Sequence, residues 1–119
     1  MRVGIDLVKV ADVAEALAEH GQHYLDRVYT PQEQADCRNE PLKLAARFAA
    51  KEATAKVLEA SRDDSLPWPS IEVIRLTDRA PTLRLHGPAA KLAESSGITQ
   101  LALSFTHEDE YAAAVVVGT

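Results

Sequence analysis

Residues 47–56 read Arg47-Phe-Ala-Ala-Lys51-Glu52-Ala-Thr-Ala-Lys56, and this stretch is the most informative part of the chain. Its alanine, lysine and glutamate residues are strong helix formers, and Pro41 upstream suits the first position of a helix. The pattern therefore predicts a long helix over about residues 42–60. Glu52 and Lys56 stand four residues apart, so both side chains project from the same face of that helix.

A strand is predicted near the N-terminus, over residues 2–8. Val3, Ile5 and Leu7 alternate there with Arg2, Gly4 and Asp6, which is the period of a half-buried strand. We expect the apolar set to face the core and Asp6 to lie on the opposite, non-core face. Asp6 then has two interpretations: a solvent-facing or helix-capping residue, or a ligand of a metal ion.

The other segments complete an α+β pattern. Helical spacing over 10–20 ends at Gly21, and Thr30, Pro31 and Glu33 match the capping box that starts a second helix. Period-two segments predict strands over 71–76, 82–85, 101–107 and 111–117, with a tight turn at 108–110 and a short helix over 88–96. Residues 61–70 read as a polar, proline-broken loop in which Trp68 packs on the core.

Length and composition favour one compact domain, residues 1–119, because 46% of the residues are hydrophobic. No apolar run approaches the roughly eighteen residues of a membrane span, and the N-terminus lacks a signal-peptide pattern, so we expect a cytoplasmic protein that binds no membrane. A single cysteine, Cys37, excludes an internal disulfide and is expected to be buried. The net charge of −5 argues against nucleic-acid binding.

Two carboxylates, Asp6 and Glu52, together with the nearby cations Arg47 and Lys56, suggest a Mg²⁺ site that holds a phosphate ester. Mg²⁺ prefers one or two carboxylates, with waters and substrate phosphates as its other ligands. The competing interpretations are a surface ion pair between Glu52 and Lys56, and ordinary surface positions for Arg47 and Lys51. His107, at the end of an apolar strand, is a phosphate contact, a titrating group or a residue without function.

The motifs resemble those of the holo-acyl-carrier-protein synthases, the small 4′-phosphopantetheinyl transferases. The resemblance covers most of the chain. The matching segments occur in the order of that family: Gly4-Ile5-Asp6, Arg27-Val-Tyr29-Thr30-Pro31 with Glu33, residues 47–56, Trp68 with Ile71-Glu72-Val73, Leu83-Arg-Leu85-His-Gly87, Leu103-Ser-Phe-Thr-His107 and Tyr111-Ala-Ala-Ala. The resemblance implies a long central helix against a mainly antiparallel sheet, and a homotrimer with sites at the subunit boundaries.

The resemblance also implies an activity. Phosphopantetheine would pass from coenzyme A to a serine of an apo acyl carrier protein, with release of 3′,5′-ADP. Asp6 and Glu52 would hold Mg²⁺, and Lys56 would contact the same phosphates as a mobile charge. Glu52, directly or through a water, would accept the serine proton. Arg47 and His107 would contact coenzyme A, and its 3′-phosphate is the candidate group.

Two departures from the family pattern keep other functions open. Residues 57–63 replace a glycine-rich turn that approaches the cofactor in many members, and Asp12 stands where the first helix often carries an arginine that docks the carrier. The partner would then be a fatty-acid carrier or, fitting Asp12 better, a polyketide-pathway carrier with a less acidic docking helix. One alternative is a non-catalytic protein that binds a carrier or coenzyme A. Another is an enzyme of the same scaffold that modifies a carrier-bound polyketide, with Glu52 or His107 as the acid–base group.

Overall fold

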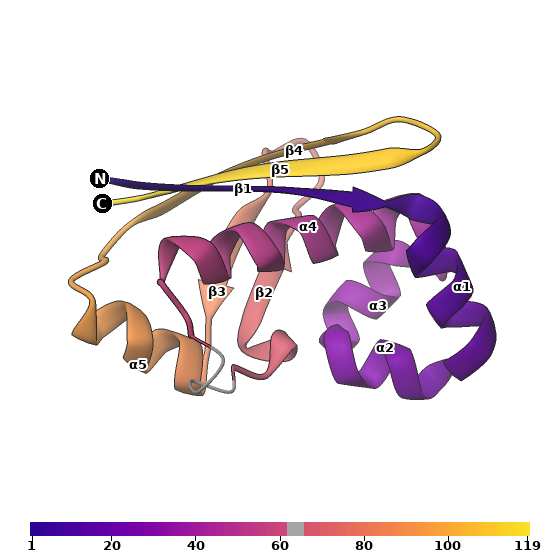
Figure 1. The fold of residues 1–119 in the computed structure, drawn as a ribbon, viewed down its shortest axis with the longest axis horizontal. Helices are drawn as coiled ribbons and strands as arrows, with labels where there is room; N and C mark the ends of the chain where they lie inside the picture. The colour runs from indigo at the N-terminus through magenta and orange to yellow at the C-terminus, as the bar shows by residue number, and fades with distance from the viewer. Residues whose placement is uncertain (62–65) are drawn as a thin grey trace.

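The computed structural model describes residues 1–61 and 66–119. A long helix, α4 (Pro41–Val57), lies under a three-stranded antiparallel sheet of order β1-β5-β4, as Figure 1 shows. The strands are β1 (Arg2–Lys9), β4 (Leu101–His107) and β5 (Tyr111–Gly118). This layer of helix on sheet confirms the predicted α+β fold with a central helix.

A second antiparallel sheet pairs β2 (Ile71–Ile74) with β3 (Thr82–Leu85). Together with α5 (Gly87–Ser95) it packs below one end of α4, and α1 (Val10–His20), α2 (Gln22–Val28) and α3 (Pro31–Cys37) gather below the other end (Figure 1). A short 3₁₀ helix, Trp68–Ser70, leads into β2. No helix in the described residues is long and apolar enough to cross a bilayer.

Local sequence signals placed several element boundaries correctly. Thr30 and Glu33 form the predicted capping box, in which each side chain accepts a hydrogen bond from the backbone N–H of the other residue. Gly21 ends α1, but α2 follows it at once, and no helix was predicted there. Residues 62–65 of the predicted loop lie outside the described residues.

The end of α4 differs from the prediction. The helix stops at Val57, because Glu59 adopts a left-handed φ of 54° and the Ala60 N–H bonds back to the Ala55 carbonyl. Glycine is the usual residue at such a position, and its absence here made the pattern read as a helix to residue 60. The strand expected over 71–76 likewise ends at Ile74.

The predicted orientation of β1 is wrong. Val3, Ile5 and Leu7 are more than 60% exposed, whereas Gly4 and Val8 are buried against α4 and Asp6 lies on that same inner face. The reason is the close approach of strand and helix at Gly4, where an added Cβ would lie 2.1 Å from the Ala53 carbonyl oxygen. A side chain as large as valine does not fit there, so the apolar set faces outward.

The middle of α4 is anchored by a buried ion pair. Lys51 Nζ donates to Glu33 Oε1 at 2.8 Å, to the Trp68 carbonyl at 3.1 Å and to the Ile71 carbonyl. Both charged side chains are fully buried, so the interpretation of Lys51 as an ordinary surface residue is wrong. Burial lowers the pKa of Lys51, and the Glu33 carboxylate opposes that shift. The pair ties α4 to α3 and to the start of β2.

Two smaller predictions about the core are confirmed. Cys37 is a free, fully buried thiol within the hydrophobic core. Trp68 is half-buried against that core and packs edge-on against Phe48 of α4, with ring centroids 5.3 Å apart.

Candidate active site

Asp6 and Glu52 line one cavity of about 390 Å³. Asp6 comes from β1 and Glu52 from α4, and the walls between them come from α1 and α2. The full lining is Asp6, Leu7, Val8, Lys9, Asp12, Val13, Ala16, Tyr24, Phe48 and Glu52. The two carboxylates therefore converge in the way that the metal hypothesis requires.

Lys56 joins the two elements that carry these carboxylates. Its Nζ donates to Asp6 Oδ1 at 3.1 Å and to the Ile5 carbonyl at 2.8 Å. The ion pair that Lys56 forms is thus with Asp6 of β1, whereas the sequence suggested a pair with Glu52. An ammonium group has three N–H donors, so one donor is left for a ligand.

The electrostatics at Glu52 favour a bound cation. Burial raises the pKa of Glu52, the Asp6 carboxylate raises it further, and the Lys56 ammonium partly opposes both effects. No cluster of three or more His, Cys, Asp or Glu side chains that could hold a metal occurs in residues 1–61 and 66–119. Two carboxylates without a complete protein cage fit Mg²⁺, which takes further oxygens from water and substrate phosphates.

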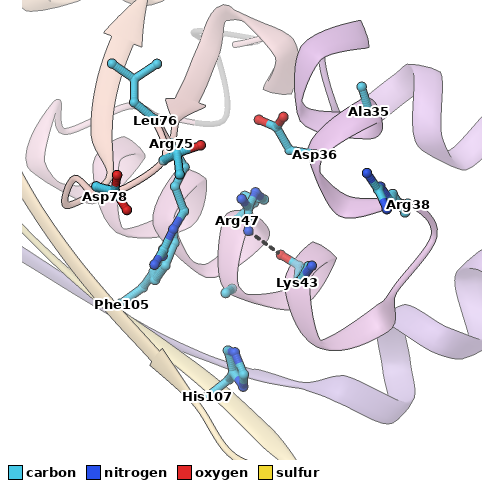
Figure 2. A pocket seen from close by; sticks show the side chains of 12 residues that line it. Ala35, Asp36, Arg38, Lys43, Arg47, Arg75, Leu76, Asp78, Phe105 and His107 are labelled. Carbon is cyan, nitrogen blue, oxygen red and sulfur yellow. Dashed lines mark hydrogen bonds between the residues drawn. The ribbon is translucent and has the colours of Figure 1, made fainter.

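Arg47 and His107 line a second, larger cavity of about 730 Å³, which Figure 2 shows. Four cationic side chains line it together with the imidazole of His107: Arg38, Lys43, Arg47 and Arg75. Two carboxylates, Asp36 and Asp78, also line it. The cavity therefore has an excess of cationic groups in a protein whose overall charge is negative.

Arg47 is the buried cation of this second cavity. It is only 5% exposed, so its interpretation as an ordinary surface residue is wrong. Its Nε has no hydrogen-bond partner among the described residues, and one terminal nitrogen makes only a long bond of 3.4 Å to the Lys43 carbonyl. A buried guanidinium with an unpaired donor is costly unless a ligand completes it, and an anion is the natural partner.

Phe105 of β4 holds two guanidinium groups beside this cavity. The Arg47 and Arg75 Cζ atoms each lie 5.7 Å from the centroid of the Phe105 ring, a separation typical of cation–π contacts. Figure 2 shows Arg75 extended along that ring. Neither Arg75 nor Phe105 was predicted to be a site residue, because Arg75 follows a short strand and nothing local links it to Arg47.

The two cavities share no lining residue. Arg47 and Glu52 are five residues apart on α4, so at 3.6 residues per turn they point to different sides of the helix. Within one chain the structure therefore brings Asp6, Glu52 and Lys56 together, and separately brings Arg47 and His107 together.

The model of the 4′-phosphopantetheinyl transferase superfamily matches residues 2–116. The chain belongs to this superfamily. It is 40% identical to the holo-[acyl-carrier-protein] synthase of Dehalococcoides mccartyi (strain CBDB1), over 96% of this chain and 94% of that one. The chain is accordingly a phosphopantetheinyl transferase of the holo-[acyl-carrier-protein] synthase type, as its motifs indicated.

Solved structures of this family have the same fold. The Helicobacter pylori holo-[acyl-carrier-protein] synthase in complex with coenzyme A superposes with a TM-score of 0.87 at 27% identity, covering 98% of this chain and 99% of that chain. An ACPS–coenzyme A complex from Chronobacterium ammoniagenes gives 0.84 at 34% identity, covering 97% and 93%. Both of those proteins were captured with coenzyme A.

Proposed function

We propose that this chain transfers 4′-phosphopantetheine from coenzyme A to a serine of an apo acyl carrier protein, in a Mg²⁺-dependent reaction that releases 3′,5′-ADP. The observation that carries the proposal is the convergence of Asp6 and Glu52 on one cavity, with Lys56 at the same junction. Residues 1–119 form one catalytic domain that acts in the cytoplasm. Its carrier belongs to a fatty-acid or polyketide pathway.

The residues present fit this chemistry. Asp6 and Glu52 would hold Mg²⁺, which when bound offsets the charge that builds up on the pyrophosphate. Lys56 places its remaining N–H toward a phosphate oxygen. The serine hydroxyl forms a new bond to the β-phosphorus, the bond from that phosphorus to the 3′,5′-ADP oxygen breaks, and Glu52 accepts the serine proton. Phosphoryl transfer asks the protein mainly for such positioning and charge compensation.

The second cavity suits the nucleotide end of coenzyme A. Arg47, whose Nε has no hydrogen-bond partner in the described part of the chain, and His107 would bind the 3′-phosphate, because a buried guanidinium gains most from a doubly charged anion. The expected result is that Arg47→Met raises the KM for coenzyme A much more than the KM for 3′-dephospho-coenzyme A. Equal effects on both substrates would remove Arg47 from 3′-phosphate recognition.

We infer a homotrimer with its sites between subunits. Val3, Ile5 and Leu7 of β1 form an exposed apolar row on the face of the sheet that points away from α4. Exposed apolar side chains do not stabilise a monomer, and such a patch marks a surface for another protein chain. The separation of the two cavities within one chain supports the same conclusion, because a second copy can place its Arg47 cavity next to the Asp6–Glu52 pair. Ile5→Lys should give monomers in sedimentation experiments and abolish transfer, whereas an active monomer would contradict the shared site.

The direct test is transfer itself. The wild-type chain, coenzyme A, Mg²⁺ and several apo-carriers are incubated, and mass spectrometry should detect a gain of about 340 Da on a carrier, the mass of the transferred group. Asp6→Ala and Glu52→Ala should abolish the gain while circular dichroism shows an intact fold. Normal turnover by either variant would refute the metal assignment. Coenzyme A binding without transfer to any carrier would favour the non-catalytic binder, and a different mass change would favour the modifying enzyme.

A further inference from the structure

The rim of the Asp6–Glu52 cavity restricts which carriers can dock, if the proposed function holds. The serine of the carrier must enter this cavity, so the carrier surface beside that serine must lie against its rim. The first turn of α1 forms part of the rim: Val13 is buried beneath it, whereas Asp12 lines the cavity and is exposed. Asp12 is therefore placed to meet the carrier.

Acidic side chains outnumber basic ones around this cavity. Helix α1 carries Asp12, Glu15 and Glu19 and contains no lysine or arginine, and Lys9 is the cation that lines the cavity. None of the ion pairs in residues 1–61 and 66–119 involves Asp12. Glu19 shares the helix and the sign of charge but does not line the cavity.

From this geometry we propose that Asp12 is a specificity-determining residue, which selects carriers with a lysine or arginine beside the modified serine and disfavours carriers with an acidic residue there. The inference rests on the proposed function and adds the chemistry of the partner surface. An acidic carrier residue opposite Asp12 is repelled at short range, and a basic residue at that point is attracted. The structural alternative is that Asp12 only stabilises the N-terminal turn of α1 through the helix dipole.

The test uses one apo acyl carrier protein of a bacterial fatty-acid synthase in two forms. The forms differ only three residues after the modified serine, where one has Glu and the other has Lys. Wild type, Asp12→Asn, Asp12→Lys and the matched control Glu19→Lys are compared by the KM for each carrier form. Asp12→Lys and Glu19→Lys change the net charge equally, on the same helix, so they separate an effect at the cavity rim from an effect of overall charge.

Wild type should favour the Lys form by about two- to fivefold, the range for one exposed charge pair. Asp12→Asn should remove this preference, Asp12→Lys should reverse it, and Glu19→Lys should keep it. The preference should fade in about 0.5 M salt, where the screening length is only a few ångströms. If Asp12 acted only through the helix dipole, its variants would lose thermal stability, and their KM values would not depend on the carrier form.

Three outcomes overturn the proposal: no preference in wild type, an unchanged preference in Asp12→Lys, or a reversal by Glu19→Lys as large as that by Asp12→Lys. Failure of the proposed function is distinguishable from these, because wild type would then transfer no phosphopantetheine to either carrier form. In that case both proposals fall together.

Discussion

Replacement of Gly4 by alanine tests whether the contact of β1 with α4 sets the geometry of the site. The new Cβ would lie 2.1 Å from the Ala53 carbonyl oxygen and 3.1 Å from a methyl group of Val57. Real Cβ atoms stay at least about 3.0 Å from such an atom, so strand and helix must separate by most of an ångström. Overpacking of this kind costs roughly 1–3 kcal/mol.

The same displacement should reduce catalysis, because Asp6 is two residues from Gly4 on the same face of β1. A misplacement of about 1 Å costs up to about a hundredfold in rate, so we expect transfer by Gly4→Ala to fall about ten- to a hundredfold. Urea denaturation measures the loss of stability. The loss of catalysis is measured by initial rates of carrier modification, at a temperature where the variant is folded.

Gly118→Ala is the matched control for this prediction. Its Cβ would meet a Val57 methyl group at 2.6 Å, so it also crowds α4, but from β5 at the end remote from Asp6. We expect this variant to lose stability and to keep near-normal transfer when folded. A Gly4→Ala protein with normal stability and normal turnover would refute the reasoning. Equal losses of rate in both variants would show that the loss of catalysis does not depend on how close the crowded glycine lies to Asp6.

Two further predictions concern buried charges of α4. Glu33→Gln and Lys51→Met should each lower the free energy of unfolding by about 3–5 kcal/mol in urea titrations, because each leaves an uncompensated buried group, and the double variant should lose less than the two single losses combined. In metal-free protein the raised pKa of Glu52 means that folding favours its protonated form, so its stabilising contribution is lost as the pH rises through that pKa. Glu52→Gln should therefore be more stable than wild type at pH 8 and equally stable near pH 3, and Mg²⁺ should stabilise wild type only; a less stable variant at pH 8 without metal would contradict this.

Local chemistry made part of the fold predictable. The capping box of Thr30 and Glu33, the stop at Gly21 and the alternation of β4 and β5 each involve residues within a few positions of one another. Such signals act before any tertiary contact forms. The end of α4 was missed for a local reason as well, since Glu59 adopts a conformation that its residue type seldom takes.

The candidate site residues, too, could be predicted from the sequence only in part. Asp6, Glu52 and Lys56 were selected by residue type, by the four-residue spacing on α4 and by resemblance to a family, and the structure brings them to one junction. Their convergence joins positions about fifty residues apart, which no spacing rule predicts. Arg75 was not selected at all, because its proximity to Phe105 arises only when the turn after β2 meets the sheet.

The amino-acid sequence alone determined most of the segments that form helices and strands, with α2 (Gln22–Val28) as the exception, and which side chains have the chemistry to hold a cation and a phosphate. Tertiary structure decided which way β1 faces: its two sets of alternating residues were equally compatible with a strand, and the choice depended on the space left by α4 at Gly4. Burial is a property of the packed molecule rather than of a segment. For that reason the outward apolar row, the inward Asp6 and the buried Arg47 became visible only in three dimensions.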